Sequence, residues 1–212
     1  MSDAHSSRDG LPDIARRPIN SDGKGSSGFL LDWHRSEPRG VVVKPGRQVL
    51  AEFFTSMLVL SSSFKYKPTP GVANYLYLVD GKWSLSLIAP GEWSEKRRAG
   101  FVGTCILQRD MTWTIEPSDR LPGDDAFVYE IGRFFDAFVQ MLDTDLTLEE
   151  ILPFCAGGMP YYQRLYASAL SRSLRAAVTM GGQRGRSGRA WQAALPKGSG
   201  ATLLGLGGKP DD

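Results

Sequence analysis

Residue types that commonly act as catalytic bases or nucleophiles are scarce in this sequence. Its two histidines, His5 and His34, both lie near the amino terminus, and Cys105 and Cys155 are far apart with no histidine nearby. This pattern suggests no Ser–His or Cys–His arrangement. It also offers no CxxC zinc motif and no disulfide framework. We therefore expect no cofactor and no metal site, and the sequence leans away from an enzyme.

Paired carboxylates are the next candidates for chemistry, because two neighbouring acids can share acid and base roles. They occur at Asp124–Asp125 and at Glu149–Glu150, in each case where a helix is predicted to begin. Helix capping and favourable placement in the helix dipole account for acids at these positions without catalysis. No phosphate-binding loop of the G-x-x-x-x-G-K-[ST] type and no dinucleotide-binding fingerprint is present.

The stretch "LSLIAPGEW" offers a different kind of site. An alternating strand pattern ends at Pro90-Gly91, because proline cannot continue a strand ladder, and Glu92 and Trp93 follow in a loop. In the structural interpretation, Trp93 covers an open sheet edge with its N–H bonded locally. Glu92 then bonds to the loop backbone or pairs with Arg97 or Arg98. In the functional interpretation, Trp93 is the stacking wall of a ligand pocket and Glu92 is a polar contact.

Strands must position this loop. "NYLYLVDGKWSLSLI" contains two alternating runs joined by Asp80-Gly81, a strong signal for a hairpin with a tight turn. Tyr75 and Tyr77 share one face of the first run. "FVGTCILQ" and "MTWTIE" predict a second pair of strands with Arg109-Asp110 at the turn. Four such strands predict a small antiparallel meander with one face that needs cover.

Helical periodicity supplies that cover. Apolar residues at helical spacing predict a helix within 47–62, a longer one that Asp124 caps, a short one opened by Thr147 and Glu150, and another over 161–179. The predicted fold class is therefore α+β, a four-stranded antiparallel meander packed against helices, with disordered N- and C-terminal tails.

Composition divides the chain into predicted segments. They are a disordered N-terminal tail (1–45), a helix plus β meander (46–120), a helical extension (121–181) and a flexible tail containing Gly and Arg (182–212). Within the first segment, "FLLDWH" is an apolar island, which docks on the body or forms only a transient cluster.

Charge is unevenly distributed. Residues 121–150 sum to −7, whereas residues 151–212 sum to +6. The two segments pair internally or serve different partners. In the basic segment, "GGQRGRSGRAW" resembles the Arg-Gly tails of RNA-associating proteins. The candidate nucleic-acid contacts are Arg184, Arg186, Arg189 and Trp191. The alternative is a solubilising tail whose arginines offset the acidic helix.

The stretch "FKYKPTPGVANYLYLVDGKWSLSLIAPGEW", followed by "FVGTCILQRDMTW", resembles domain-of-unknown-function family 2452. The matching positions are Pro68, Gly71, Tyr75, Leu76, Tyr77, Ser86, Ile88, Pro90, Glu92, Trp93, Phe101, Gly103, Leu107, Asp110 and Trp113. The resemblance covers about residues 64–116. It implies the sheet and a role for Glu92 and Trp93 beyond packing, but no activity, because none is established for that family.

The leading functional hypothesis is a non-enzymatic binding or adaptor module in the cytoplasm whose partner is another protein. Its candidate contacts are Tyr75, Tyr77, Glu92, Trp93 and Trp113. Two alternatives are a nucleic-acid-associated protein that uses the basic C-terminal helix and tail, and a small-molecule-binding protein with a pocket beside Pro90–Trp93. No apolar run is long enough to span a membrane, and the sequence leaves the oligomeric state open.

Overall fold

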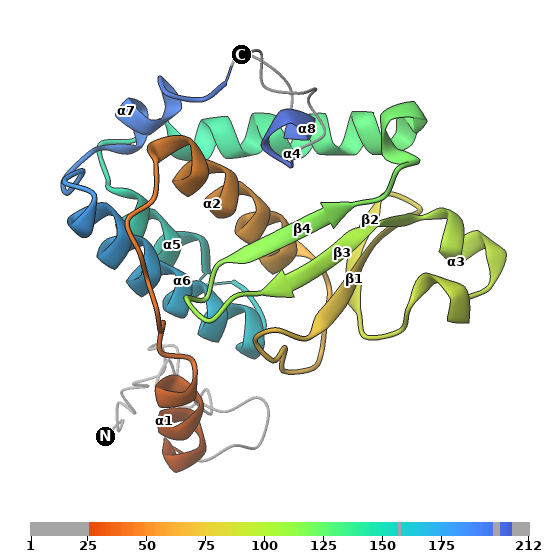
Figure 1. Ribbon diagram of the computed structural model, residues 1–212, viewed down its shortest axis with the longest axis horizontal. Helices are drawn as coiled ribbons and strands as arrows, with labels where there is room; N and C mark the ends of the chain where they lie inside the picture. Colours follow the sequence, from red (N-terminus) through yellow and green to blue (C-terminus); the bar gives the residue numbers. More distant parts are fainter. Residues whose placement is uncertain (1–25, 157, 197–199, 205–212) are drawn as a thin grey trace, which may run out of the picture.

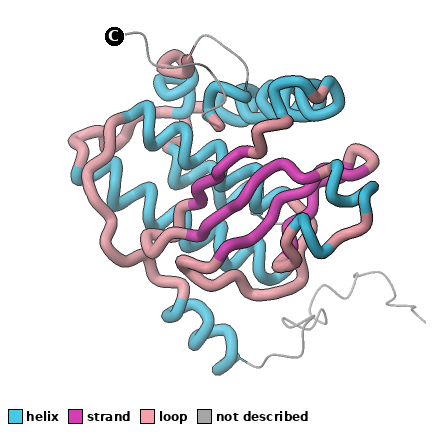
Figure 2. The backbone as a smooth tube through the Cα atoms, turned by 45° about the vertical axis from the view of Figure 1, so that its right-hand side comes forward, coloured by secondary structure: helices cyan, strands magenta, loops and turns pink. Residues whose placement is uncertain are grey.

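The computed structural model describes residues 26–156, 158–196 and 200–204. It contains a sheet with helices packed mainly on one of its faces (Figures 1 and 2). The strands are β1 (Ala73–Val79), β2 (Lys82–Ser86), β3 (Phe101–Leu107) and β4 (Trp113–Pro117). The helices are α1 (Ser26–Arg35), α2 (Gly46–Ser61), α3 (Glu95–Ala99), α4 (Asp125–Leu142), α5 (Leu148–Ala156), α6 (Tyr161–Met180), α7 (Gly188–Gln192) and α8 (Gly200–Leu203), with 3-10 turns η2 (Pro90–Glu92) and η3 (Leu121–Gly123).

The prediction of an α+β fold with four antiparallel strands is confirmed. The hairpin at Asp80-Gly81 is also confirmed, and both residues have the positive φ angles, 51° and 71°, that a tight hairpin turn requires. The strand order, β2-β1-β3-β4, differs from that of a simple meander. Strand β1 lies between β2 and β3, so the chain must cross β1 after β2. Turn η2 and helix α3 make this connection.

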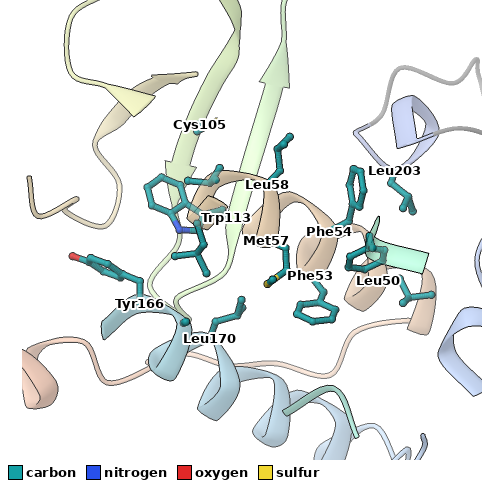
Figure 3. Close-up of a cluster of buried hydrophobic side chains, with 14 of the residues drawn as sticks. Leu50, Phe53, Phe54, Met57, Leu58, Cys105, Trp113, Tyr166, Leu170 and Leu203 are labelled. Atoms are coloured by element: carbon teal, nitrogen blue, oxygen red, sulfur yellow. The ribbon is translucent and has the colours of Figure 1, made fainter. Parts of the chain in front are cut away.

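Helix α2 occupies the centre of the core. All residues from Phe53 to Leu60 are buried, and all of them except Thr55 and Ser56 are apolar, as expected for a helix that is enclosed on every side. Figure 3 shows Phe53, Phe54 and Met57 of this helix among side chains of the sheet and of α6 and α8. From β3, the thiol of Cys105 lies in the same core with no exposed surface.

The helices after the sheet cover the other sides of α2. Asp124 caps α4 as predicted, since its Oδ1 accepts a hydrogen bond from the Phe127 N–H at 3.0 Å. Phe134, Phe135 and Phe138 of α4 meet the Phe54 ring edge-on, at centroid distances of 5.1–6.1 Å. Val128, although apolar, is exposed on α4.

The prediction of a disordered tail over residues 1–45 is wrong for residues 26–45. Helix α1 docks on the body through Asp32, which accepts hydrogen bonds from Lys67 Nζ at 2.6 Å and from the Tyr161 hydroxyl at 3.1 Å. The guanidinium of Arg172 lies 4.3 Å from the centre of the Trp33 ring. The apolar island is therefore an anchor on the body, whereas residues 1–25 lie outside the described part of the chain.

The prediction of a flexible tail over residues 182–212 is wrong for most of its length. Trp191 of α7 is 1% exposed, and Leu203 and Leu204 are also buried. The segment carries too few apolar residues to show a periodicity, yet these three side chains join the core formed by the rest of the chain. Residues 197–199 and 205–212 lie outside the described residues.

We predict that Trp191→Ala lowers the free energy of unfolding by about 3–5 kcal/mol, because it empties a fully buried aromatic site. Urea denaturation followed by circular dichroism measures this loss. Arg184→Ala is the matched control, because Arg184 is exposed on the same segment, and it should change stability by less than about 0.5 kcal/mol. Wild-type stability for the Trp191 variant would contradict the docking of this segment on the core.

Candidate functional site

The chain leaves β2 through a short turn that Glu92 stabilises. The Glu92 carboxylate accepts a hydrogen bond from the Ala89 backbone N–H at 3.1 Å and so caps η2. This bond to the loop backbone is one of the two structural roles predicted for Glu92. The turn directs the next residue, Trp93, and then α3 back over the outer face of the sheet, the face opposite α2.

An aromatic cluster lies on this outer face. We define it as Tyr75 and Tyr77 of β1, Trp93 after η2, Arg97 of α3 and Phe101 of β3. Because side chains alternate along a strand, Leu76 enters the core while Tyr75 and Tyr77 point to the other side. The rings of Tyr77 and Trp93 meet edge-on at 6.5 Å, and those of Tyr77 and Phe101 lie 5.7 Å apart.

Arg97 holds the cluster together. Its guanidinium carbon lies 4.2 Å from the centre of the Trp93 ring and 5.8 Å from that of Tyr77, within the range of a cation–π contact. Tyr77 is fully buried, and its hydroxyl donates to the Ile88 carbonyl oxygen at 2.8 Å. Burial raises the pKa of Tyr77 to about 12, although the Arg97 charge acts in the opposite direction. Tyr77 is therefore a neutral supporting residue at ordinary pH.

Two hydrogen-bond donors in the cluster lack acceptors. Trp93 Nε1 and Arg97 Nε are buried, and neither has a hydrogen-bond partner of good geometry among the described residues. A side-chain hydrogen bond from Trp93 nevertheless acts to lower the pKa of Tyr77, so the prediction that the Trp93 N–H is satisfied locally stays a prediction. A buried donor without an acceptor costs about 1–3 kcal/mol, so these two groups make the cluster locally less stable than a fully hydrogen-bonded one would be. Trp93 itself is only half-buried.

Trp113 lies on the opposite side of the sheet from the other residues predicted to contact a partner. Its side chain is 1% exposed and lies in the core beside α2 (Figure 3). Its backbone N–H donates to Ser56 Oγ of that helix at 2.9 Å. Trp113 therefore joins the sheet to α2 and does not line the outer face, which corrects its assignment as a partner contact.

The predicted nucleic-acid residues do not form an open basic surface. Trp191 is buried and cannot stack on a base. Arg186 lies 4.2 Å from the centre of its ring and donates to the Ala190 carbonyl at 2.7 Å. Arg189 pairs with Asp143 and Asp145 at 2.8 and 2.6 Å. The ion pairs of Arg189 show the predicted internal pairing of the acidic and basic segments. Of the four predicted residues, Arg184 is exposed and makes no such contact with the described residues.

A second cluster was missed by the sequence analysis. Lys44 Nζ lies 2.5 Å from Glu52 Oε2 and 2.6 Å from Asp110 Oδ2, and all three side chains are largely buried. The other oxygen of Asp110 accepts from the backbone and the hydroxyl of Thr112, at 3.1 and 2.7 Å. Asp110 therefore fixes the β3–β4 turn and ties it to the segment before α2. Lys44 lies in the segment that was predicted to be a disordered tail. The cluster could have been predicted only from knowledge that this segment packs against the distant β3–β4 turn.

Burial and hydrogen bonding oppose each other in this cluster. Burial alone would raise the pKa of the Asp110 carboxyl, but hydrogen bonds from Lys44 and Thr112 hold it below its ordinary value of 3.8. Burial alone would lower the pKa of Lys44, but its bonds to Asp110 and Glu52 raise it above 10.5. Both groups stay charged at neutral pH, which identifies the cluster as an ionic link between segments.

Metal-binding clusters and membrane-spanning helices are two features that the described residues lack. Among residues 26–156, 158–196 and 200–204, no group of three or more His, Cys, Asp and Glu side chains is placed to hold a metal ion. In the same part of the chain, no helix is long and apolar enough to cross a bilayer.

No family model, curated protein sequence or solved structure matches this chain. The resemblance of residues 64–116 to family 2452 therefore stays a prediction.

We predict that Asp110→Asn lowers the free energy of unfolding at pH 7 by about 3–5 kcal/mol, because it leaves the buried Lys44 ammonium without one of its two carboxylates. The depressed pKa of Asp110 means that its stabilisation is present above about pH 4 and is lost as the pH falls through its lower pKa in the folded protein. Urea titrations between pH 7 and pH 2 should therefore show the two stabilities converging in acid.

Asp80→Asn is the control for this experiment. Asp80 forms an exposed ion pair with Lys96 at 3.0 Å, and asparagine tolerates its positive φ angle. Its loss should cost less than about 1 kcal/mol. Parallel stability curves for wild type and Asp110→Asn down to pH 2 would contradict the role given to Asp110.

Proposed function

We propose that this chain is a non-enzymatic binding module that holds another protein on the aromatic cluster of its outer sheet face. The observation that carries the proposal is the half-buried pair of Trp93 and Arg97 on the outer face, with the guanidinium carbon 4.2 Å from the centre of the indole ring. A partner that supplies an acceptor oxygen there would gain a charge-assisted hydrogen bond.

The surroundings of this pair define the chemistry of the partner. Leu87 and Ile88, on the loop that leads to η2, are 54% and 40% exposed. Arg97 and Arg98 provide positive charge on α3. The best match is a peptide segment that carries a carboxylate for the arginines next to an apolar side chain for Leu87 and Ile88.

The cluster is also pre-organised for binding. Arg97 is already held between the Trp93 and Tyr77 rings, so less side-chain entropy is lost when it engages a carboxylate. Tryptophan, tyrosine and arginine are the residue types that dominate binding energy in protein interfaces. The buried free thiol of Cys105 fits a reducing compartment, and we propose the cytoplasm as the place of action.

The alternatives are less well supported. The tail-based nucleic-acid hypothesis depended on Trp191 as a stacking group and on Arg189 as a free cation, but these residues are buried and paired, respectively. A small-molecule pocket beside Pro90–Trp93 would need to enclose Trp93, whereas Glu92 and the rest of η2 are exposed to solvent or only half-buried.

Selection from a displayed library of random peptides tests the proposal without a known partner. We expect enriched peptides to combine an acidic residue with an aliphatic or aromatic neighbour. Arg97→Ala and Trp93→Ala should each weaken their binding by roughly tenfold or more, as for interface anchors. Fluorescence anisotropy with labelled peptide measures the affinity.

Glu95→Ala is the matched control, because Glu95 is an exposed acid on the same helix, and it should leave binding intact. Circular dichroism and melting curves of each variant must show a folded protein. Peptide binding that survives both cluster substitutions would exclude this surface. Salt-sensitive binding of labelled single-stranded RNA that requires Arg97 would replace the protein partner with a nucleic acid.

A further inference from the structure

The chain that joins α1 to α2 runs as an extended stretch along the side of the molecule (Figure 1). No turn interrupts residues 41–45, and the proline that follows Lys44 favours an extended conformation at that residue. Val41, Val42 and Val43 come before Lys44, and valine favours the strand conformation. Val42 and Val43 are 57% and 62% exposed. We call residues 40–44 the linking segment.

The backbone of the linking segment is unpaired. Just before it, the backbone N–H of Arg39 donates to the Arg109 carbonyl oxygen of the β3–β4 turn at 2.9 Å. From Gly40 to Lys44, the backbone N–H and C=O groups form no hydrogen bond with any described residue. These groups therefore bond to water or to a partner. An extended row of unpaired backbone groups is the surface to which another chain can add as a strand.

A groove lies between the linking segment and the β3–β4 turn. It consists of two adjoining hollows of about 640 Å³ each, which share Arg39, Gly40, Pro70 and Arg109 as lining residues. Val42 and Pro70 give its walls exposed apolar surface. The groove therefore leaves space for an extended chain beside the linking segment.

The charges of the groove determine which chain fits. Arg35, Arg39 and Arg109 line it and are exposed, and none of them forms an ion pair with the described residues. Lys44 and its two carboxylate partners also line the groove but pair with one another. Glu37 is the remaining acid on the described wall. Three arginines against one acid favour an acidic occupant.

The same charges argue against a second copy of this chain as the occupant. Two linking segments paired with one another would gather the exposed arginines of both copies along one seam. Like charges across an interface repel and disfavour the pairing. A partner with acidic side chains replaces this repulsion with charge-assisted hydrogen bonds.

We propose that the groove beside the linking segment binds an extended acidic peptide segment of another protein. The peptide adds as a strand to the backbone of residues 40–44, and its carboxylates bond to Arg39 and Arg109. Apolar side chains between the carboxylates pack on Val42 and Pro70. None of the described residues that line the two hollows belongs to the aromatic cluster, so this surface is a second one and does not depend on the proposed function.

Hydrogen–deuterium exchange of the full chain tests the proposal with two synthetic peptides. One alternates valine with glutamate and the other alternates valine with lysine. We expect the glutamate peptide to slow exchange within residues 41–44, because backbone pairing protects amides. The lysine peptide should leave exchange there unchanged. Unprotected amides in this segment at millimolar glutamate peptide would overturn the proposal.

Fluorescence anisotropy with the labelled glutamate peptide measures the contribution of the arginines. Arg39→Ala combined with Arg109→Ala should weaken binding by roughly tenfold or more, since two charge-assisted contacts are lost. Both side chains are exposed, so the melting temperature should not change, and replacement of both by lysine should retain binding. Arg184→Ala is the matched control, because Arg184 is an exposed arginine that does not line the groove.

Proline substitutions test the backbone pairing itself. Neighbouring N–H groups of an extended chain point to opposite sides, so Val42→Pro and Val43→Pro remove donors from opposite edges of the segment. One of the two variants should lose most of its affinity, whereas the other should keep it. Wild-type affinity in both would overturn the addition of a strand.

Two further results would overturn the proposal. Unchanged affinity in the double alanine variant would exclude the groove. Binding that requires Arg97 and not Arg39 or Arg109 would place the peptide on the aromatic cluster instead. Labelled single-stranded RNA that binds through Arg39 and Arg109 more tightly than the glutamate peptide would replace the peptide with a nucleic acid.

Discussion

Residues 53–60 of α2 are buried on every side of the helix, so they need packing partners all round. The inner face of the sheet covers one side and is joined to α2 by the hydrogen bond from Trp113 to Ser56 Oγ. The phenylalanines of α4 cover another side, and α6 and α8 complete the enclosure (Figure 3). Because a single central helix needs so many partners, short segments near both ends of the described chain are held against the body.

The same requirement leaves the sheet with two unlike faces. The long helices α2, α4 and α6 lie on the inner side, and among the described residues the connection from β2 to β3 passes over the outer face. That connection returns to the sheet at Gly100, where a Cβ atom would lie 2.3 Å from the Leu78 carbonyl oxygen. The missing side chain lets α3 approach β1 closely and places Arg97 over the rings of Trp93 and Tyr77.

The features that sequence reasoning predicted are those that neighbouring residues decide. The Asp80-Gly81 hairpin, the Asp124 cap and the bond from Glu92 to its own loop all depend on residues within a few positions of one another. The features that it missed depend on distant partners. Lys44 meets Asp110 across 66 positions, Trp191 is buried by other segments, and the side of the sheet that Trp113 occupies follows from the β3–β4 register.

The enclosure of Cys105 has a kinetic consequence. Its sulfur has no exposed surface, and burial raises the pKa of the thiol far above its ordinary value, so the reactive thiolate is almost absent in the closed molecule. A thiol reagent can then modify this residue only when the sheet separates from α2. In a chain whose Cys155 has been replaced, the labelling rate would therefore report how often the core opens.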